Sequence, residues 1–409
     1  MSEEMRVTVE RLGHRGDGIA EGPIYVPGIL PGEVVEGVVD NGVMANPRIV
    51  TPVEDRVAPP CRHAKSCGGC QLQHASDAFV EGWKSDVVAR ALAAQGLETE
   101  QRPCITSPAQ SRRRAGFSAR RTKKGALAGF HAKASDVLIA VPDCKLVRPR
   151  LAAALPLAEA LAVAGTSRKA ELTVQMTDSE AGLDVSVTGG KSIDDDFRVT
   201  LAGIAQEYDV ARLAWDEEVL TLRPPFQTFG SAQVVPPPGA FLQATQEGEA
   251  TLLACVSEAL NGAKHMLDLF AGCGTFALPL ARLGRVHAVE GSKEMVRALD
   301  KGWRMAEGVR HVTHEARDLF RNPLLPDELT RFDGVVIDPP RAGAEAQVTQ
   351  LAKARIPRIA FVSCNPVTFA RDAKILTSAG YRLDWVQTVD QFRWSTHVEL
   401  VAQLTLAKS

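Results

Sequence analysis

The stretch "LDLFAGCGTFALPLA" (267–281) has the pattern of a buried strand, a glycine turn and the start of a helix. Gly272 and Gly274 allow a tight turn and a close approach of a ligand to the backbone. The free N–H groups at the helix N-terminus favour a negatively charged group. The third glycine of the dinucleotide-binding fingerprint is missing, so a carboxylate-bearing ligand fits this turn better than a pyrophosphate.

The next strand-like run, "RVHAVE", ends at Glu290, sixteen residues beyond Gly274. A carboxylate at this position can bind both hydroxyl groups of a ribose, although a solvated charge at a strand end is an equally ordinary interpretation. Together, the glycine turn and Glu290 favour S-adenosylmethionine bound to the sheet of a class I methyltransferase.

From about residue 240 onward, apolar strand-like runs alternate with helical stretches, which is typical of a parallel sheet covered by helices on both faces. Ligands of such sheets bind beyond the carboxyl ends of the strands. The glycine turn, Glu290, Asp338 and Cys364 each follow a strand, so we expect them to line one crevice. Glu399 joins them if the final strand runs antiparallel, as it does in class I methyltransferases.

Cys364 ends the buried run "RIAFVSC", and Pro366 bars the strand from continuing. Free cysteine is among the most buried residue types, so an inert core thiol is the simpler interpretation. The expected convergence at one crevice favours a nucleophile instead.

The rest of the chain divides into two further parts. Residues 1–57 contain short strand-like pieces separated by Gly/Pro turns, which indicates a small barrel. Residues 58–235 mix helices and strands in an α+β pattern, and a proline-rich hinge precedes the last part, 236–409.

The motifs "FLQAT", "LDLFAGCGTFALPLA", "VEGS", "DPPRAG", "VSCNPVTFARD" and "STHVE" resemble those of the RNA uracil-C5 methyltransferases, which make 5-methyluridine in tRNA and ribosomal RNA. The resemblance implies a class I Rossmann-like α/β methyltransferase domain. It also implies an N-terminal OB-like TRAM β-barrel, which residues 1–57 resemble, and an α+β central iron–sulfur domain at 58–235. RNA is the expected partner.

The chemistry of such enzymes explains the residue types. Uracil C5 is too weak a nucleophile to take a methyl group from a sulfonium, and a thiolate that adds at C6 makes C5 electron-rich. A base must then remove the C5 proton so that the thiol is regenerated. The resemblance implies that Cys364 is the nucleophile and Glu399 the base. The cofactor would be surrounded by Gln243, Phe270, Thr275, Glu290, Asp318 and Asp338.

One departure from the family pattern precedes the base. In "DQFRWSTHVE", Arg393 and Trp394 follow the phenylalanine, where many relatives have a proline. We expect this change to affect the loop near the target base and to leave Glu399 in place.

Three cysteines have the spacing C-x5-C-x2-C, at Cys61, Cys67 and Cys70, and Cys144 can provide a fourth thiolate. Such a set suits an iron–sulfur cluster, whereas zinc sites usually pair two C-x2-C knuckles. The resemblance implies a [4Fe-4S] cluster at the same four positions, and zinc is the alternative. No task is assigned to Cys104, Cys255 and Cys273.

A basic segment, "SRRRAGFSARRTKK" (111–124), carries seven positive side chains, although the net charge of the chain is −2. Such a run is often only a solvated face, but beside a uracil-directed site we expect phosphate contacts. The seven are Arg112, Arg113, Arg114, Arg120, Arg121, Lys123 and Lys124.

The N-terminus has no pattern of an export signal, and the apolar stretch 151–165 is too short to span a bilayer. We therefore expect a cytoplasmic enzyme without a membrane partner or an obligatory protein partner.

The predicted reaction is methyl transfer from S-adenosylmethionine to C5 of a specific uridine in RNA. The expected cluster favours 23S ribosomal RNA as substrate, because the resembling bacterial tRNA enzymes typically lack one. A tRNA methyltransferase and a non-catalytic iron–sulfur RNA-binding protein are alternatives. A methyltransferase acting on an amine or small molecule would need neither the thiol nor the basic segment.

Overall fold

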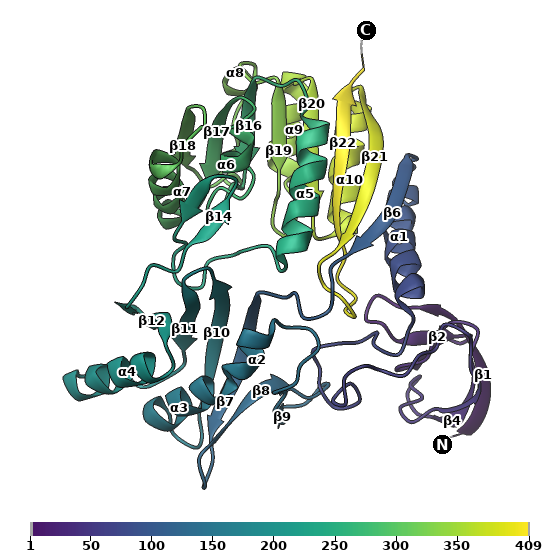
Figure 1. Ribbon diagram of the computed structural model, residues 1–409. Coiled ribbons are helices and arrows are strands. Elements are labelled where there is room, and N and C mark those ends of the chain that lie inside the picture. The colour runs from purple at the N-terminus through teal and green to yellow at the C-terminus, as the bar shows by residue number, and fades with distance from the viewer. Residues whose placement is uncertain (1–2, 408–409) are drawn as a thin grey trace.

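The computed structural model describes residues 3–407, which form three β-sheet units and one small hairpin. Figure 1 shows the N-terminal strands beside the first helix, a middle sheet below, and a large sheet that contains the C-terminus. Within the described residues, we find no helix with the length and apolarity needed to cross a membrane.

The N-terminal sheet is curved and wholly antiparallel, in the order β3-β2-β1-β4-β5 (Figure 1). Its strands are β1 Glu3–Leu12, β2 Gly18–Ala20, β3 Ile24–Val26, β4 Val34–Val39 and β5 Arg48–Thr51. Val9, Val26, Val35 and Met44 fill its core. The short strands agree with the expected β-rich unit, whereas its assignment as a TRAM barrel stays a prediction.

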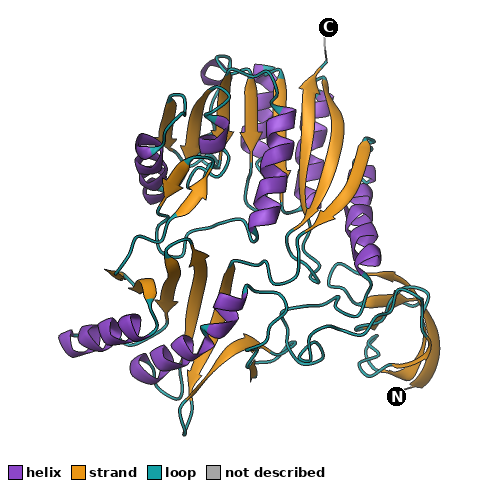
Figure 2. Cartoon of the chain, viewed as in Figure 1, coloured by secondary structure: helices purple, strands orange, loops and turns teal. Residues whose placement is uncertain are grey.

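The middle unit is a seven-stranded sheet covered by α2–α4 (Figure 2). Its order is β13-β12-β11-β10-β7-β8-β9. The strands are β7 Arg114–Arg121, β8 Ala126–His131, β9 Leu138–Ile139, β10 Glu171–Ser179, β11 Gly182–Thr188, β12 Val210–Trp215 and β13 Glu218–Thr221. The helices are α2 Pro149–Ala153, α3 Leu155–Gly165 and α4 Asp195–Glu207. The α+β pattern expected for this part is present.

The large sheet has eight strands in the order β18-β17-β16-β19-β20-β22-β21-β6. They are β6 Glu100–Thr106, β16 His265–Leu269, β17 Arg285–Glu290, β18 Val312–Ala316, β19 Gly334–Ile337, β20 Arg358–Ser363, β21 Tyr381–Asp390 and β22 Glu399–Leu406. β16 to β20 pair in parallel, and β22 runs antiparallel to β20 and β21. The condition for Glu399 to join the carboxyl edge is therefore met.

Helices cover both faces of this sheet, as the strand-helix alternation predicts. The face packed against α1, α8, α9 and α10 forms one apolar core, and the face packed against α5, α6 and α7 forms another. The helices are α1 Asp77–Ala93, α5 Gln246–Ala259, α6 Ala277–Leu280, α7 Lys293–Met305, α8 Pro326–Leu329, α9 Glu345–Ala354 and α10 Pro366–Ser378. The hairpin β14 Gln227–Phe229 and β15 Ala232–Val234 packs against α7.

The capping residues at the start of α7 and α10 show where the preceding strands, β17 and β20, have ended. The Ser292 hydroxyl accepts the N–H of Met295 at the start of α7, two residues after Glu290. Asn365 caps α10, and Pro366 occupies its first turn, where the missing N–H is no loss. Cys364 therefore lies in the short turn between β20 and α10.

The large sheet takes its last strand from the segment predicted as the central domain. β6 pairs in parallel with β21, and α1 packs against β6 and α10. The predicted domain boundary between residues 235 and 236 therefore does not divide the large sheet from the rest of the chain, because β6 and α1, which precede this boundary, belong to the sheet and its helix cover.

A buried ion pair holds α1 against the end of β21. Lys84 Nζ lies 2.6 Å from Asp390 Oδ1, and both side chains are fully buried. Lys84 also donates to the carbonyl of Phe392, at 3.3 Å. Burial lowers the pKa of Lys84, while Asp390 opposes that shift. The pair thereby connects an N-terminal helix to the chain segment that follows β21.

We predict that Lys84→Met lowers the free energy of unfolding by about 3–5 kcal/mol, because it leaves the Asp390 charge buried without its partner. Urea denaturation followed by circular dichroism measures this loss. Lys84→Met combined with Asp390→Leu should recover much of it, because both charges are then removed.

The control is Arg198→Ala, which breaks an exposed pair with Glu218. Its cost should be far smaller, because water and salt screen an exposed pair. A loss for Lys84→Met no larger than for this control would show that the buried pair does not anchor α1.

Candidate active site

A cavity of about 720 Å³ opens at the carboxyl edge of the large sheet. Six of the predicted site residues line it: Phe270, Glu290, Asp318, Asp338, Cys364 and Glu399. Gln243 is buried behind this lining and donates to Asp338, whereas Thr275 lies in the glycine turn but does not line the cavity. The expected crevice is present, while the role of each residue stays a prediction.

The glycine turn and Glu290 form one wall. Gly274 has φ +96°, and a Cβ atom there would lie 2.7 Å from Leu278 Cδ1, so only glycine fits. Glu290 Oε2 accepts the N–H of Gly272 at 3.0 Å, and Oε1 accepts the N–H of Ser292 at 2.8 Å. A carboxylate oxygen has two lone pairs, so each can still accept from a hydroxyl group of a ligand.

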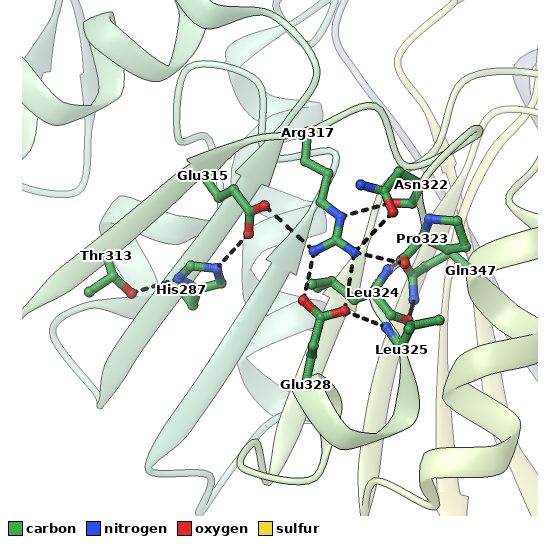
Figure 3. A network of polar contacts seen from close by, with 10 residues as sticks. All are labelled: His287, Thr313, Glu315, Arg317, Asn322, Pro323, Leu324, Leu325, Glu328 and Gln347. Atoms are coloured by element: carbon green, nitrogen blue, oxygen red, sulfur yellow. Dashed lines mark hydrogen bonds and ion pairs between the residues drawn. The ribbon is translucent and has the colours of Figure 1, made fainter.

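A second wall is the loop after β18, which a network around Arg317 holds in place (Figure 3). Arg317 binds both carboxylate oxygens of Glu328, at 2.7 and 3.1 Å, and donates to the carbonyls of Asn322 and Pro323, at 2.7 and 3.0 Å. Such fork-shaped pairing fixes both partners. Sequence reasoning named Asp318 but missed this arginine beside it.

The network presents an apolar patch to the cavity. Leu319 and Phe320 line it, and the ring centroid of Phe320 lies 5.5 Å from that of Phe270. Flat aromatic surfaces of this kind suit an adenine ring. This wall and Glu290 together fit the nucleoside half of S-adenosylmethionine.

A chain of side-chain amides links the two acidic residues at the other end. Gln243 Nε2 donates to Asp338 Oδ2 at 3.2 Å, and Gln391 Nε2 donates to both Gln243 Oε1 and Glu399 Oε2, at 2.6 and 3.1 Å. The N–H of Ala244 donates to Gln391 Oε1 at 2.9 Å. Sequence reasoning missed Gln391, although it lies in the quoted segment "DQFRWSTHVE".

Burial shifts the pKa values of the groups at this end upward. It raises the pKa of Cys364 to about 11, to which the charges of Glu399 and Asp338 add, while Arg341 opposes the shift. The pKa of Glu399 is raised by burial and by Asp338, and the pKa of Asp338 is raised by burial. These shifts favour the protonated thiol and oppose the ionisation of both carboxyl groups at once.

A cation also lies at this end. Arg341 Nη2 lies 2.6 Å from His397 Nδ1, and both residues line the cavity. Because a guanidinium only donates, Nδ1 must accept and the ring carries its proton on Nε2. Burial and Arg341 lower the pKa of His397, which agrees with a neutral ring. Arg341 belongs to the "DPPRAG" motif, yet its side chain was not among the predicted site residues.

Of the four predicted cluster cysteines, Cys144 lies in the core of the middle unit, and Cys67 and Cys70 pack against it. Burial raises the pKa of Cys70 to about 12, and the charges of Cys144, Cys67 and Cys61 add to the shift. Cys67 Sγ and Cys144 Sγ each accept a backbone N–H at 3.4 Å, from Gly69 and Leu146. Within residues 3–407, however, we find no group of three or more Cys, His, Asp or Glu side chains able to hold a metal ion.

The basic segment is not one solvated face. Arg113 is buried, pairs with Glu249 and donates to the carbonyl of Gln243 at 3.0 Å, so it is not available to phosphate, contrary to our expectation. Arg112 lies over the ring of Phe392 and Arg114 over that of Phe241, both at the cavity. Burial explains the difference, because the segment just before β7 packs against Gln243 and Glu249.

Known proteins of related sequence match this chain over nearly its whole length. The family described as tRNA (Uracil-5-)-methyltransferase matches residues 234–407. An uncharacterized RNA methyltransferase of Rhizobium meliloti is 43% identical, over 97% of this chain and 98% of that protein. The 23S rRNA (uracil(1939)-C(5))-methyltransferase RlmD of a Shewanella species is 30% identical, over 100% of this chain and 97% of that protein.

A solved structure is similar over the same length. It is the Pyrococcus abyssi tRNA (uracil-54, C5)-methyltransferase in complex with S-adenosyl-L-homocysteine, with a TM-score of 0.75 and 25% identity. The match covers 98% of this chain and 100% of that one.

We predict that Glu290→Gln weakens the binding of S-adenosylhomocysteine about 10- to 100-fold, measured by isothermal titration calorimetry. The amide would turn a donor toward the N–H of Gly272 or Ser292 and lose an acceptor for the ribose, a loss of about 1–3 kcal/mol. Glu294→Gln, on an exposed residue in the first turn of α7, is the control and should leave the affinity unchanged. Equal affinities of the two variants would exclude Glu290 as a ligand of the ribose.

Proposed function

The chain belongs to the RNA uracil-C5 methyltransferase family and is an S-adenosylmethionine-dependent RNA methyltransferase, and we propose that its substrate is one specific uridine of 23S ribosomal RNA. Two features support ribosomal RNA. A relative that acts on 23S rRNA matches nearly the full length of both chains, and this chain has the four cysteines of the iron–sulfur type. A tRNA is the alternative, favoured by the solved structure of a tRNA enzyme.

The observation that carries the proposed mechanism is that Cys364 and Glu399 line the same cavity as Glu290 and Asp338. Cys364 adds through sulfur to C6 of the uracil, and its proton passes to a neighbouring carboxylate. The negative charge that develops on the ring lies beside the cation Arg341. S-adenosylmethionine supplies the electrophilic methyl group that C5 takes. Glu399 then removes the C5 proton, and the C6–S bond breaks to release the Cys364 thiolate, which takes up a proton to restore the thiol.

Each cavity residue has a task in this scheme. Glu290 binds the ribose, Asp318 and Phe270 lie at the nucleoside half, and Asp338 with Gln243 holds the methionine half near the target base. Thr275 acts only through the shape of the glycine turn. The target uridine must leave its stack to reach Cys364, as enzymes that modify bases require.

The carboxylates close to Cys364 can accept the proton that its thiol releases when the sulfur attacks C6. In the resting site the pKa of Cys364 is about 11, so attack requires a nearby base for its proton. Glu399 and Asp338 line the same cavity as the thiol, and their charges raise its pKa further. Where Glu399 takes up the proton in the first step, that proton must leave it before Glu399 can act as base in the last.

We also propose a task for each of the other parts. Residues 1–57 would form a TRAM-like RNA-binding barrel, residues 58–235 an iron–sulfur-containing domain, and residues 236–409 the methyltransferase domain completed by β6. The enzyme would act in the cytoplasm.

The four cysteines, Cys61, Cys67, Cys70 and Cys144, would hold a [4Fe-4S] cluster. Thiolates that accept backbone N–H groups suit such a cluster, because these hydrogen bonds stabilise the charge on sulfur. The loop after Cys70 reaches the active site, since the N–H groups of Gln71 and Leu72 donate to the carbonyl of Trp394, at 2.8 and 2.9 Å. A cluster here would therefore fix the segment that carries Gln391 and His397.

The substrate and the nucleophile are tested together in cells that lack this protein. We predict that their 23S rRNA lacks one 5-methyluridine, that the wild-type gene restores it, and that Cys364→Ala does not. The purified variant should lose at least about a thousandfold in rate and keep its RNA affinity, because covalent activation of C5 is removed while the binding surface remains. Mass spectrometry of rRNA and tRNA digests measures both.

Cys104→Ala, which changes another half-buried thiol, is the control and should restore methylation. If the cells lack 5-methyluridine in tRNA but keep it in 23S rRNA, the substrate is a tRNA, as in the alternative above. Normal methylation by Cys364→Ala would end the covalent mechanism altogether.

The pH dependence tests Glu399. We predict that kcat/KM rises as Glu399 loses its proton, with a midpoint above that of an ordinary carboxyl group, because burial and Asp338 raise its pKa. Asp338→Asn removes the negative neighbour, lowers the pKa of Glu399 and moves the midpoint to lower pH. Asp318→Asn, in the same cavity, should leave it in place. A midpoint that Asp338→Asn leaves unchanged or raises would rule out the assigned base.

Anaerobic purification tests the cluster. We predict about four iron and four sulfide per chain, with absorption near 400 nm, from the four-cysteine ligand set. Cys70→Ser should lose iron and absorption, whereas Cys255→Ser, at a cysteine outside the set, should keep both. Zinc in place of iron in the purified protein would show that the alternative metal is correct.

A further inference from the structure

A second cavity, of about 410 Å³, lies at the amino edge of the large sheet. Its lining residues are His265, Arg285, Val286, His287, His311, Thr313 and Arg331, none of which lines the cavity at the carboxyl edge. β17 begins at Arg285 and ends at Glu290, so the two cavities are roughly 17 Å apart along the strand, at about 3.3 Å per residue. The proposed methyl transfer makes no use of this second cavity.

The charge of the lining is one-sided. It contains two arginines, three histidines and a threonine, and no carboxylate. Lys264 and Arg310 directly precede His265 and His311 in the chain. Among residues 3–407, the side-chain nitrogens of Lys264, Arg285, Arg310 and Arg331 have no carboxylate oxygen within 4.0 Å, although those of 19 other lysines and arginines do. The nearby carboxylate of Asp333 accepts the backbone N–H groups of Lys264 and His265.

The sheet register brings these side chains together. His265 of β16 pairs with Arg285 of β17, and His287 of β17 pairs with Thr313 of β18, so each pair points to one face. The ring of Phe332 contacts several of them: its centroid lies 4.7 Å from that of His265 and 4.8 Å from the guanidinium carbon of Arg331. The strand register and the ring of Phe332 therefore hold these side chains at one end of the sheet.

His287 is the buried member of the set, with 8% of its surface exposed. Its Nδ1 lies 2.7 Å from the hydroxyl of Thr313, and its Nε2 has no hydrogen-bond partner in the described structure. The nearby carboxylate of Glu315 lies 3.8 Å from Nε2, beyond hydrogen-bond distance, and also contacts Arg317 (Figure 3). A buried imidazole with a free nitrogen normally has a partner, such as a ligand or water.

We propose that this cavity binds a phosphate group. Guanidinium groups match the tetrahedral oxygens of phosphate and remain charged at every physiological pH, and imidazole and hydroxyl groups add further hydrogen bonds. The volume lies within the range of ligand sites and exceeds the needs of one phosphate, so the phosphate is attached to a larger molecule. The phosphodiester backbone of the RNA substrate and a free nucleotide are the two sources.

The test compares the wild-type chain with Arg285→Ala combined with Arg331→Ala. Both side chains are exposed, so the fold should be unaffected. One arm measures the binding of a 30-nucleotide oligouridylate by fluorescence anisotropy at several salt concentrations, and the other measures inorganic pyrophosphate by calorimetry. The control removes the same charge at exposed lysines, with Lys353→Ala and Lys374→Ala on α9 and α10.

If RNA is the source, the double variant should bind the oligouridylate about tenfold more weakly, with a salt dependence reduced by about two phosphate contacts. If a free nucleotide is the source, pyrophosphate binding should fall about tenfold while RNA binding is unchanged. Equal binding of both probes by the double variant, the control and the wild type would overturn the proposal. Neither arm depends on methyl transfer, and Cys364→Ala should behave as the wild type in both.

Discussion

The active site depends on the orientation of one buried amide. The N–H of Ala244 can only donate, so it fixes Gln391 with its oxygen toward residue 244 and its nitrogen toward the cavity. The nitrogen donates to Gln243, whose own nitrogen must then face Asp338. A backbone group thus determines that both acidic side chains meet donors. The acceptor ends of the amides point away from them, which suits carboxylates that must be able to hold negative charge.

This amide needs a segment that is held from several directions. Asp390, directly before Gln391, pairs with Lys84 from α1, and Trp394 accepts two N–H groups from the loop that follows Cys70. The ring of Trp394 is buried in the core of the middle unit. The departure at Arg393 and Trp394 from the common family pattern is therefore a docking point between parts of the chain. Arg393 completes it, since it donates to the carbonyl of Ser107 and pairs with Asp77.

Much of this architecture could be predicted, because local rules determine it. The glycine turn, the cap at Asn365 and the apolar strands place Glu290 and Cys364 at strand ends whatever the remote contacts are. β6 could not be predicted in the same way. Exposed and half-buried residues alternate along β6, and its sequence has no strong apolar run. β6 joins the large sheet by pairing with β21, which lies near the other end of the chain, so no local pattern could reveal this partner.

The same distinction applies to the site. Residues inside distinctive motifs, such as Cys364 and Asp338, were named from the sequence, and the structure brings them to one cavity. Gln391, Arg341 and Arg317 were missed because an amide or arginine gives no local signal of its partner. The basic segment failed for a related reason. Seven positive charges within fourteen residues suggest a surface, whereas Arg113, just before β7, is buried and pairs with Glu249.

The position of β6 has a consequence for how the chain folds during synthesis. Thr99 donates to the carbonyl of Leu383, a contact across 284 residues. β6 and α1 leave the ribosome early, with apolar surface that the much later elements α10 and β21 cover. Contacts so distant in sequence close late, because a long loop must first be ordered. The nascent chain therefore keeps an open strand edge at β6 until β21 has been made, an interval in which that edge is exposed to pairing with other chains.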